Sequence, residues 1–154
     1  MGIYFNPNNG SFTKDINSEV YIDKTGLLEY LNKVICTNAN CISVSHARRF
    51  GKSHAAGMID AYYSLGCDSY ELLKDTDIAT KDSFKKHLNK YNVIHLDVSS
   101  FWDSYKDNIV EKIVEYIYKD FKMAFGESLD YESKLSYVLM TIYQKNKHSI
   151  CNNN

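Results

Sequence analysis

The sequence predicts an α/β fold in which helices cover a short parallel β-sheet. Two short apolar runs rich in β-branched residues, 41–45 and 93–98, are typical of strands buried on both faces. Helical spacing of apolar residues precedes the first run and follows both. Strands that alternate with helices indicate parallel pairing through helical crossovers rather than a set of hairpins.

The chain has the size and composition of one globular domain. It has 154 residues, of which 44% are hydrophobic and 24% charged, and a single proline, Pro7. These values are ordinary for a folded domain and exclude a disordered chain. We expect one domain over 1–145 and an unstructured tail over 146–154.

The first third of the chain predicts a loop, a strand and a helix. Residues 6–12 are rich in turn-forming residues and predict a surface loop. Residues 19–23 alternate between polar and apolar side chains and predict a short strand. The segment 25–34 predicts a helix, because its leucines fall at helical spacing and Thr25 can cap its first turn.

The rest of the chain predicts mostly helices. Apolar stripes or capping residues predict them over 53–66, 68–73, 80–91, 104–125 and 131–146. The segment 104–125 has the clearest stripe. Only two or three strands remain, whereas sheets usually have about four to six. The sequence therefore predicts a sheet that is incomplete.

The candidate site is the tripeptide Gly51-Lys52-Ser53, between the predicted strand 41–45 and the helix that follows. In a phosphate-binding loop, backbone N–H groups at a helix N-terminus converge on an anion. The lysine reaches the β- and γ-phosphates, and the serine hydroxyl binds Mg²⁺. His46 stands where the usual first glycine would be. The pattern alone leaves two alternatives, a nucleotide site or a basic loop that starts a helix.

The charge of the chain indicates that any anion would bind through positive charge gathered locally at this loop. The formal net charge is -1, so no overall field attracts nucleic acid or an anionic membrane, and we expect neither as a direct partner. Arg48 and Arg49 add local positive charge, which suits phosphate oxygens but also suits a solvated turn. The N-terminus has no secretory signal and the four cysteines have no metal spacing, which favours reduced thiols and a cytoplasmic location.

Several stretches together resemble the AAA-ATPase-like family of predicted ATPases. They are the opening through residue 32, the loop "SVSHARRFGKS" with the helix after it, "SFKKHLNKYNVIHLDVSSF" and "LSYVLMTIYQ". The family has an Arg-Arg-Phe-Gly-Lys-Ser loop without the first glycine. Arg48, Arg49, Phe50, Gly51, Lys52 and Ser53 match it, whereas His46 and Ala47 replace the family's Arg-Pro.

The resemblance implies a three-layer αβα domain of the P-loop NTPase type that binds ATP with Mg²⁺. It implies nucleotide contacts from residues 48–53 and a magnesium contact from Ser53. It also suggests that Tyr21, Asp23 and Lys24 line the base or ribose side. Family members often carry a C-terminal nuclease-like domain of the PD-(D/E)XK type.

One expected feature does not appear in the sequence. In the family, a strand after the helix that ends near Gln144 carries the Walker B acid pair, whereas this sequence continues with "KNKHSICNNN". The chain is therefore expected to be truncated before Walker B. Asp97, after the apolar run 93–96, resembles the missing aspartate and is a candidate Mg²⁺ ligand; its alternative role is to close a strand or to cap the segment that follows.

Two functions follow as expectations. The first is ATP binding through a degenerate Walker A loop, with weak or no hydrolysis, because the loop supplies no group that activates the attacking water. The second is a non-catalytic fragment that acts as a protein-interaction module or is the product of a decayed gene. A protein partner or a nuclease-like domain elsewhere in the intact protein fits either function.

Overall fold

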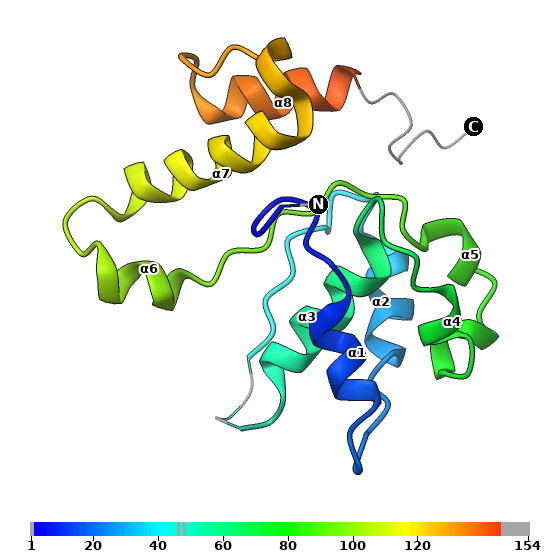
Figure 1. Cartoon of the computed structure of the whole chain (residues 1–154). Helices are drawn as coiled ribbons and strands as arrows, with labels where there is room; N and C mark the ends of the chain where they lie inside the picture. Colours follow the sequence, from blue (N-terminus) through cyan, green and yellow to red (C-terminus); the bar gives the residue numbers. More distant parts are fainter. Residues whose placement is uncertain (1, 46, 48, 146–154) are drawn as a thin grey trace.

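The chain folds as a set of helices joined by loops of very different length, the longest of them between α2 and α3 (Figure 1). The computed structural model describes residues 2–45, 47 and 49–145. In chain order the elements are α1 (Gly10–Ile16), α2 (Gly26–Val34), α3 (Lys52–Tyr63), α4 (Tyr70–Leu73), the 3-10 turn η1 (Asp77–Thr80), α5 (Phe84–His87), α6 (Val98–Ser104), α7 (Ile109–Phe125), the 3-10 turn η2 (Gly126–Ser128) and α8 (Leu135–Lys145).

The predicted α/β fold with a parallel sheet, and with it the three-layer αβα arrangement, is wrong for the part of the chain that the structure describes. No β-strand forms there; the pairings recorded are isolated bridges between Phe5 and Ile94 and between Ser64 and Tyr91. A β-prone segment becomes a strand only where a neighbour satisfies its backbone N–H and C=O groups. Residues 19–23 and 41–45 lack such a neighbour, and Val20 and Val44 are exposed.

A first hydrophobic core joins α2, α3 and the short helices that follow α3. Its buried members are Phe12, Leu28, Met58, Ala61, Tyr62, Tyr63, Leu73, Ile78, Phe84 and Tyr91. Asn32 on α2 donates to the hydroxyl of Tyr62 at 2.9 Å and accepts from the hydroxyl of Tyr63 at 2.7 Å. These bonds satisfy polar groups inside an apolar core, which would otherwise cost stability. Helix α3 is thereby fixed against α2.

Helix α1 packs against α3. It starts at Gly10, so the surface loop predicted over 6–12 is wrong for the last residues of that segment. The N–H of Gly10 donates to the side chain of Asn8 at 2.9 Å, and the helix buries Phe12. Gly57 on α3 allows the close approach, because a Cβ there would lie 3.1 Å from the hydroxyl of Ser11. The packing brings the end of α1 beside the start of α3.

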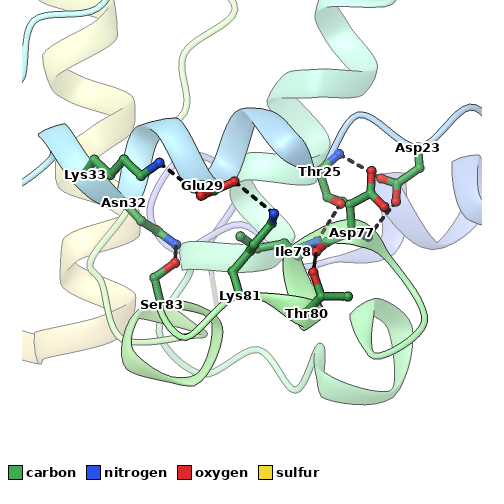
Figure 2. A network of polar contacts seen from close by, with 10 residues as sticks. All are labelled: Asp23, Thr25, Glu29, Asn32, Lys33, Asp77, Ile78, Thr80, Lys81 and Ser83. Carbon is green, nitrogen blue, oxygen red and sulfur yellow. Dashed lines mark hydrogen bonds and ion pairs between the residues drawn. The ribbon is translucent and has the colours of Figure 1, made fainter.

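A polar network ties the start of α2 to η1 (Figure 2). The carboxylate of Asp23 accepts from the backbone N–H of Thr25 and from that of Asp77, both at 2.8 Å. Thr25 occupies the predicted N-cap position of α2, but its hydroxyl accepts from the N–H of Ile78 at 3.1 Å rather than from its own helix. The network holds the segment that carries Lys24 in one place.

A second core lies between α7, α8 and the N-terminal segment. Its buried members are Phe5, Ile117, Phe121, Leu129, Val138 and Ile142. Asp120 on α7 is buried and accepts from the backbone N–H groups of Tyr4 at 2.6 Å and Phe5 at 3.0 Å. One carboxylate thus attaches the N-terminal segment to α7.

Most of the predicted helices are confirmed, with shifted ends. Helices α2, α3, α7 and α8 lie inside the predicted segments or start within one residue of them. The segment 68–73 is helical only from Tyr70, after Ser69, which makes no side-chain cap, so the capping box predicted from Asp68 is wrong. The domain boundary at 145 stays a prediction, and the tail 146–154 lies outside the described residues.

The cysteines depart in part from the prediction of reduced thiols. Cys41 is an exposed free thiol, and Cys67 donates from its Sγ to the carbonyl of Pro7 at 3.5 Å, whereas Cys36 is disulfide-bonded. Among the helices of residues 2–45 and 49–145, none combines the length and the apolar character that crossing a membrane requires.

Candidate functional site

The Gly-Lys-Ser sequence lies at the N-terminal end of α3. Gly51 is the N-cap, with φ 81° and ψ 31°, and Lys52 and Ser53 are the first two helical residues. Arg49 also has a positive φ of 68°. The Cβ atom of other residues makes this left-handed backbone unfavourable, whereas glycine adopts it without a steric penalty. The chain therefore turns sharply just before the helix starts, as a loop that curls around an anion must.

The N-terminus of α3 has the polarity that an anion requires. The N–H of Ala55 donates to the carbonyl of Gly51 at 2.9 Å, which is the first turn of the helix. N–H groups before that point have no acceptor within an α-helix, and they carry the positive end of the helix dipole. The first turn holds no acidic residue, and no described side chain caps it. Lys52 and Ser53 are exposed beside these groups.

Two lysines from different segments bind carbonyls of the loop. The ammonium of Lys52 donates to the backbone oxygen of Ala47 at 3.3 Å. The ammonium of Lys24, which comes from the segment before α2, donates to the backbone oxygen of Phe50 at 2.8 Å. Together with Arg49 they gather positive charge at the start of α3.

A cavity of about 390 Å³ lies directly beside the loop. Its walls come from α1, the segment 18–24, the loop and the first two turns of α3. The lining residues are Phe12, Asp15, Ser18, Val20, Tyr21, Ile22, Lys24, Arg49, Phe50, Gly51, His54, Ala55 and Met58. Its size lies within the range of sites for small molecules.

The cavity wall contains polar groups, of which Asp15 and His54 were not identified as site residues by the sequence analysis. The side chains of Asp15 and His54 are in contact, with 2.6 Å between Oδ1 and Nδ1. The other carboxylate oxygen of Asp15 and the hydroxyl of Tyr21 are buried and have no hydrogen-bond partner among the described residues. Burial, with smaller effects from the carboxylates of Asp23 and Asp15, raises the pKa of Tyr21 to about 12. Its hydroxyl therefore stays protonated at neutral pH.

The structure brings together the predicted loop residues that it describes. Arg49, Phe50, Gly51, Lys52 and Ser53 lie consecutively at the start of α3, and the side chain of Phe50 is 58% exposed. Arg48 lies outside the described residues. The assignment of residues 48–53 to nucleotide binding stays a prediction.

Asp97 lies elsewhere and has a local partner. It is the N-cap of α6, and its carboxylate accepts from the N–H of Ser99 at 3.0 Å. Hydrogen bonds from Ser99 lower the pKa of Asp97. Figure 1 shows α6 well apart from the N-terminal end of α3. The alternative role of Asp97, capping the segment that follows, is confirmed, whereas its role as a Mg²⁺ ligand stays a prediction.

Of the segment 21–24, Tyr21 and Lys24 line the cavity, whereas Asp23 binds backbone N–H groups of α2 and η1. Asp15 and His54 escaped the sequence analysis because neither stands in a motif and they lie far apart along the chain. Only the packing of α1 on α3 brings them together.

The comparisons with known proteins identify one family. A family model described as a predicted AAA-ATPase matches residues 11–151, which is most of the chain. No curated protein matches, and no solved structure matches.

Proposed function

The chain belongs to the AAA-ATPase-like family of predicted AAA-ATPases, and from this premise we propose that it binds ATP through residues 48–53. The observation that carries the proposal is the backbone of Gly51. Its left-handed conformation starts α3 so that Lys52 and Ser53 stand exposed at the positive end of the helix. A basic turn that only started a helix would not need a cavity of small-molecule size beside it.

The basic residues and Gly51 of the loop each have a role in this proposal. N–H groups at the start of α3 bind phosphate oxygens, and the ammonium of Lys52 leaves the carbonyl of Ala47 to pair with the β- and γ-phosphates. Arg49, and Arg48 beside it in the sequence, add charge that pairs well with phosphate. Gly51 allows the backbone to approach the ligand closely.

The donor set fits a magnesium ion that arrives with the nucleotide. Ser53 offers an exposed hydroxyl, and Mg²⁺ in such sites keeps phosphates and waters as most of its ligands. Within the part of the chain that the structure describes, no group of three or more His, Cys, Asp or Glu side chains is placed to hold a metal. The metal would supply charge stabilisation for the phosphates.

We propose that hydrolysis is weak or absent. Phosphoryl transfer to water needs a group that positions and activates the attacking water, besides the contacts to the phosphates. Residues 49–53 supply phosphate contacts and one hydroxyl, and none of them is a general base. Because ATP is abundant in the cytoplasm, nucleotide binding in this proposal implies a cytoplasmic location. The nucleotide state would be transmitted to a protein partner or a nuclease-like domain.

A second candidate function is protein interaction without nucleotide. The observation that favours it is the apolar surface of α8, where Tyr137, Met140 and Tyr143 are exposed. A helix face of this kind is a common part of protein interfaces. This function predicts a folded protein that does not bind ATP.

Calorimetric titration with Mg·ATP and with a non-hydrolysable analogue separates the two functions. We expect saturable binding that Lys52→Ala abolishes or weakens by more than tenfold, because hydrogen bonds to charged groups are among the strongest. Lys85→Ala is the matched control, since it removes an exposed lysine from α5, outside the loop and the cavity. A folded protein that releases no heat with either ligand would overturn the proposal and favour the second function.

A further inference from the structure

The segment 41–45, between α2 and the loop before α3, has backbone groups without hydrogen-bond partners. It forms no helix, turn or bend, and each of its residues is exposed. Figure 1 shows it as part of the cyan trace that runs from α2 toward α3. The backbone of 42–45 makes no hydrogen bond to the part of the chain that the structure describes. The N–H and C=O groups of such a segment are a template for another strand.

The side chains of this segment are those of a strand. Ile42 and Val44 are β-branched, and they lie on one side of an extended chain because successive side chains alternate. Their exposed fractions are 36% and 54%. Cys41, Ser43 and Ser45 occupy the other side. Burying the two apolar side chains against a second strand is favourable. The segment therefore fits an extended polypeptide.

The segment also lacks the features by which proteins protect exposed strands. Charged side chains and proline normally prevent one strand edge from pairing with another. Between Lys33 and Arg48 the sequence contains no Asp, Glu, Lys, Arg or Pro. The other exposed β-prone segment, 19–23, has Glu19 and Asp23 at its ends. A second copy of 41–45 would thus meet no charge of its own sign and no missing backbone donor.

The residue pattern of 41–45 is self-complementary in an antiparallel register. With Ser43 opposite Ser43 of a second copy, Ile42 of each copy faces Val44 of the other. Pairs of β-branched residues and pairs of serines are favourable neighbours across two strands. Antiparallel pairing also places the two basic loops at opposite ends of the ribbon. Parallel pairing would bring Arg49 of one copy beside Arg49 of the other.

We propose that 41–45 is a dimerisation strand, which pairs with the same segment of a second copy of this chain, antiparallel about Ser43. Such an isologous contact uses the same surface of both copies. The segment offers no charge to a charged partner strand, whereas its own sequence supplies matching side chains. The net charge of -1 adds little repulsion between copies. This inference is independent of the proposed nucleotide site.

The size of the contact limits its strength. A stable protein interface buries roughly 1,600 Å² in total, and two short paired strands bury less. A two-stranded ribbon alone is marginally stable in water. We therefore expect a weak dimer with a dissociation constant of roughly 0.1 mM.

Sedimentation equilibrium of the full chain measures the association. All samples carry Cys41→Ser, which excludes a dimer linked through this exposed thiol. We expect the average mass to rise from monomer toward dimer between about 10 µM and about 1 mM. Val44→Lys should weaken the dimer by about tenfold or more, because its charge would face Ile42 of the second copy. Val110→Lys is the matched control, since Val110 is a 70% exposed valine on α7, and it should dimerise unchanged.

Engineered cysteines test the register. Ser43→Cys would place the new thiols of two copies directly opposite, at a Cα separation of about 4.5–5.5 Å that a disulfide can span. Ser45→Cys is the matched control, because each new thiol would lie about 13 Å or more from its equivalent along the ribbon. We expect oxidation to give a linked dimer with Ser43→Cys and little with Ser45→Cys.

Several results would overturn the inference. A protein that stays monomeric at about 1 mM would show that a second copy does not cover the segment. A dimer that Val44→Lys leaves intact would assign the contact to another surface, such as the exposed face of α8. Equal cross-linking of the two cysteine variants would exclude the register. Circular dichroism confirms that each variant is folded, and no nucleotide is present, so failure of ATP binding leaves these outcomes unaffected.

Discussion

The ammonium of Lys24 donates a hydrogen bond of 2.8 Å to the backbone carbonyl of Phe50, which lies 26 positions further along the chain. The segment that carries Lys24 is itself fixed, because Asp23 binds the backbone N–H of Asp77 (Figure 2). The side chain of Lys24 therefore holds the loop before α3 to the segment that starts α2.

Lys24→Met should weaken the binding of Mg·ATP by about fivefold, since one hydrogen bond that orders the loop is lost while the apolar stem is kept. Tripolyphosphate should weaken by a similar factor, because the change acts on the loop. Calorimetry measures both. Lys85→Met on α5 is the control and should bind as the parent protein does; an unchanged affinity in Lys24→Met would contradict the role of this bond.

Gly51→Ala should impair both the loop and the stability of the protein. Gly51 has a φ of 81°, and its new Cβ would lie 2.6 Å from Nζ of Lys24, which must then move away. The left-handed backbone costs a non-glycine residue about 1–2 kcal/mol. We expect the free energy of unfolding, measured with urea, to fall by about this amount.

Gly26→Ala is the matched control for this prediction. A Cβ at Gly26, the first residue of α2, meets no other atom within 4 Å, and its φ is not positive. Alanine favours a helix over glycine, so this variant should be as stable as the parent protein or slightly more stable. Equal stability of the two variants would show that the left-handed turn at Gly51 is not required.

The helices could be predicted from the sequence, and the sheet could not be. On α7, Ile113, Ile117 and Phe121 follow the helical period, which a single segment displays without any partner. A strand cannot be predicted from its own segment in this way, because its stability depends on the segment that pairs with it. The run 93–98 finds only the bridge of Ile94 to Phe5, so its β-branched composition gave a wrong prediction.

The candidate site likewise has one part that the sequence could predict and one part that it could not. The loop could be predicted, because Gly51, Lys52 and Ser53 are consecutive and their chemistry depends on local backbone geometry. The cavity could not be predicted, because Asp15 and His54 meet only through the packing of α1 on α3. Helix α1 itself was not predicted, because it starts in a segment rich in turn-forming residues.

Asp120→Ala should destabilise the protein by about 2–3 kcal/mol. The carboxylate of Asp120 accepts from the backbone N–H groups of Tyr4 and Phe5, and its loss leaves two donors unpaired, that of Phe5 buried and that of Tyr4 partly buried. Asp120→Asn keeps one acceptor oxygen and should lose less. Urea unfolding followed by circular dichroism measures both; a loss below roughly 0.5 kcal/mol for the alanine variant would contradict this role.

His87 should make the stability depend on pH. Burial, with a smaller effect from the charge of Lys86, lowers the pKa of His87 below its ordinary value of 6.5. The imidazole is buried and its Nδ1 contacts the hydroxyl of Tyr91. The folded state thus disfavours the protonated ring, so the unfolded state binds more protons between the folded pKa and 6.5.

The sign of the effect follows from this difference. The contribution of His87 to stability is fully present above pH 6.5 and is lost as the pH falls below 6.5 toward the lower pKa of the folded state. The free energy of unfolding, measured with urea from pH 8 to pH 5, should therefore decrease in the acidic half of this range. His87→Gln removes the titrating ring and should flatten that part of the profile, whereas an unchanged slope would assign the pH dependence to other groups.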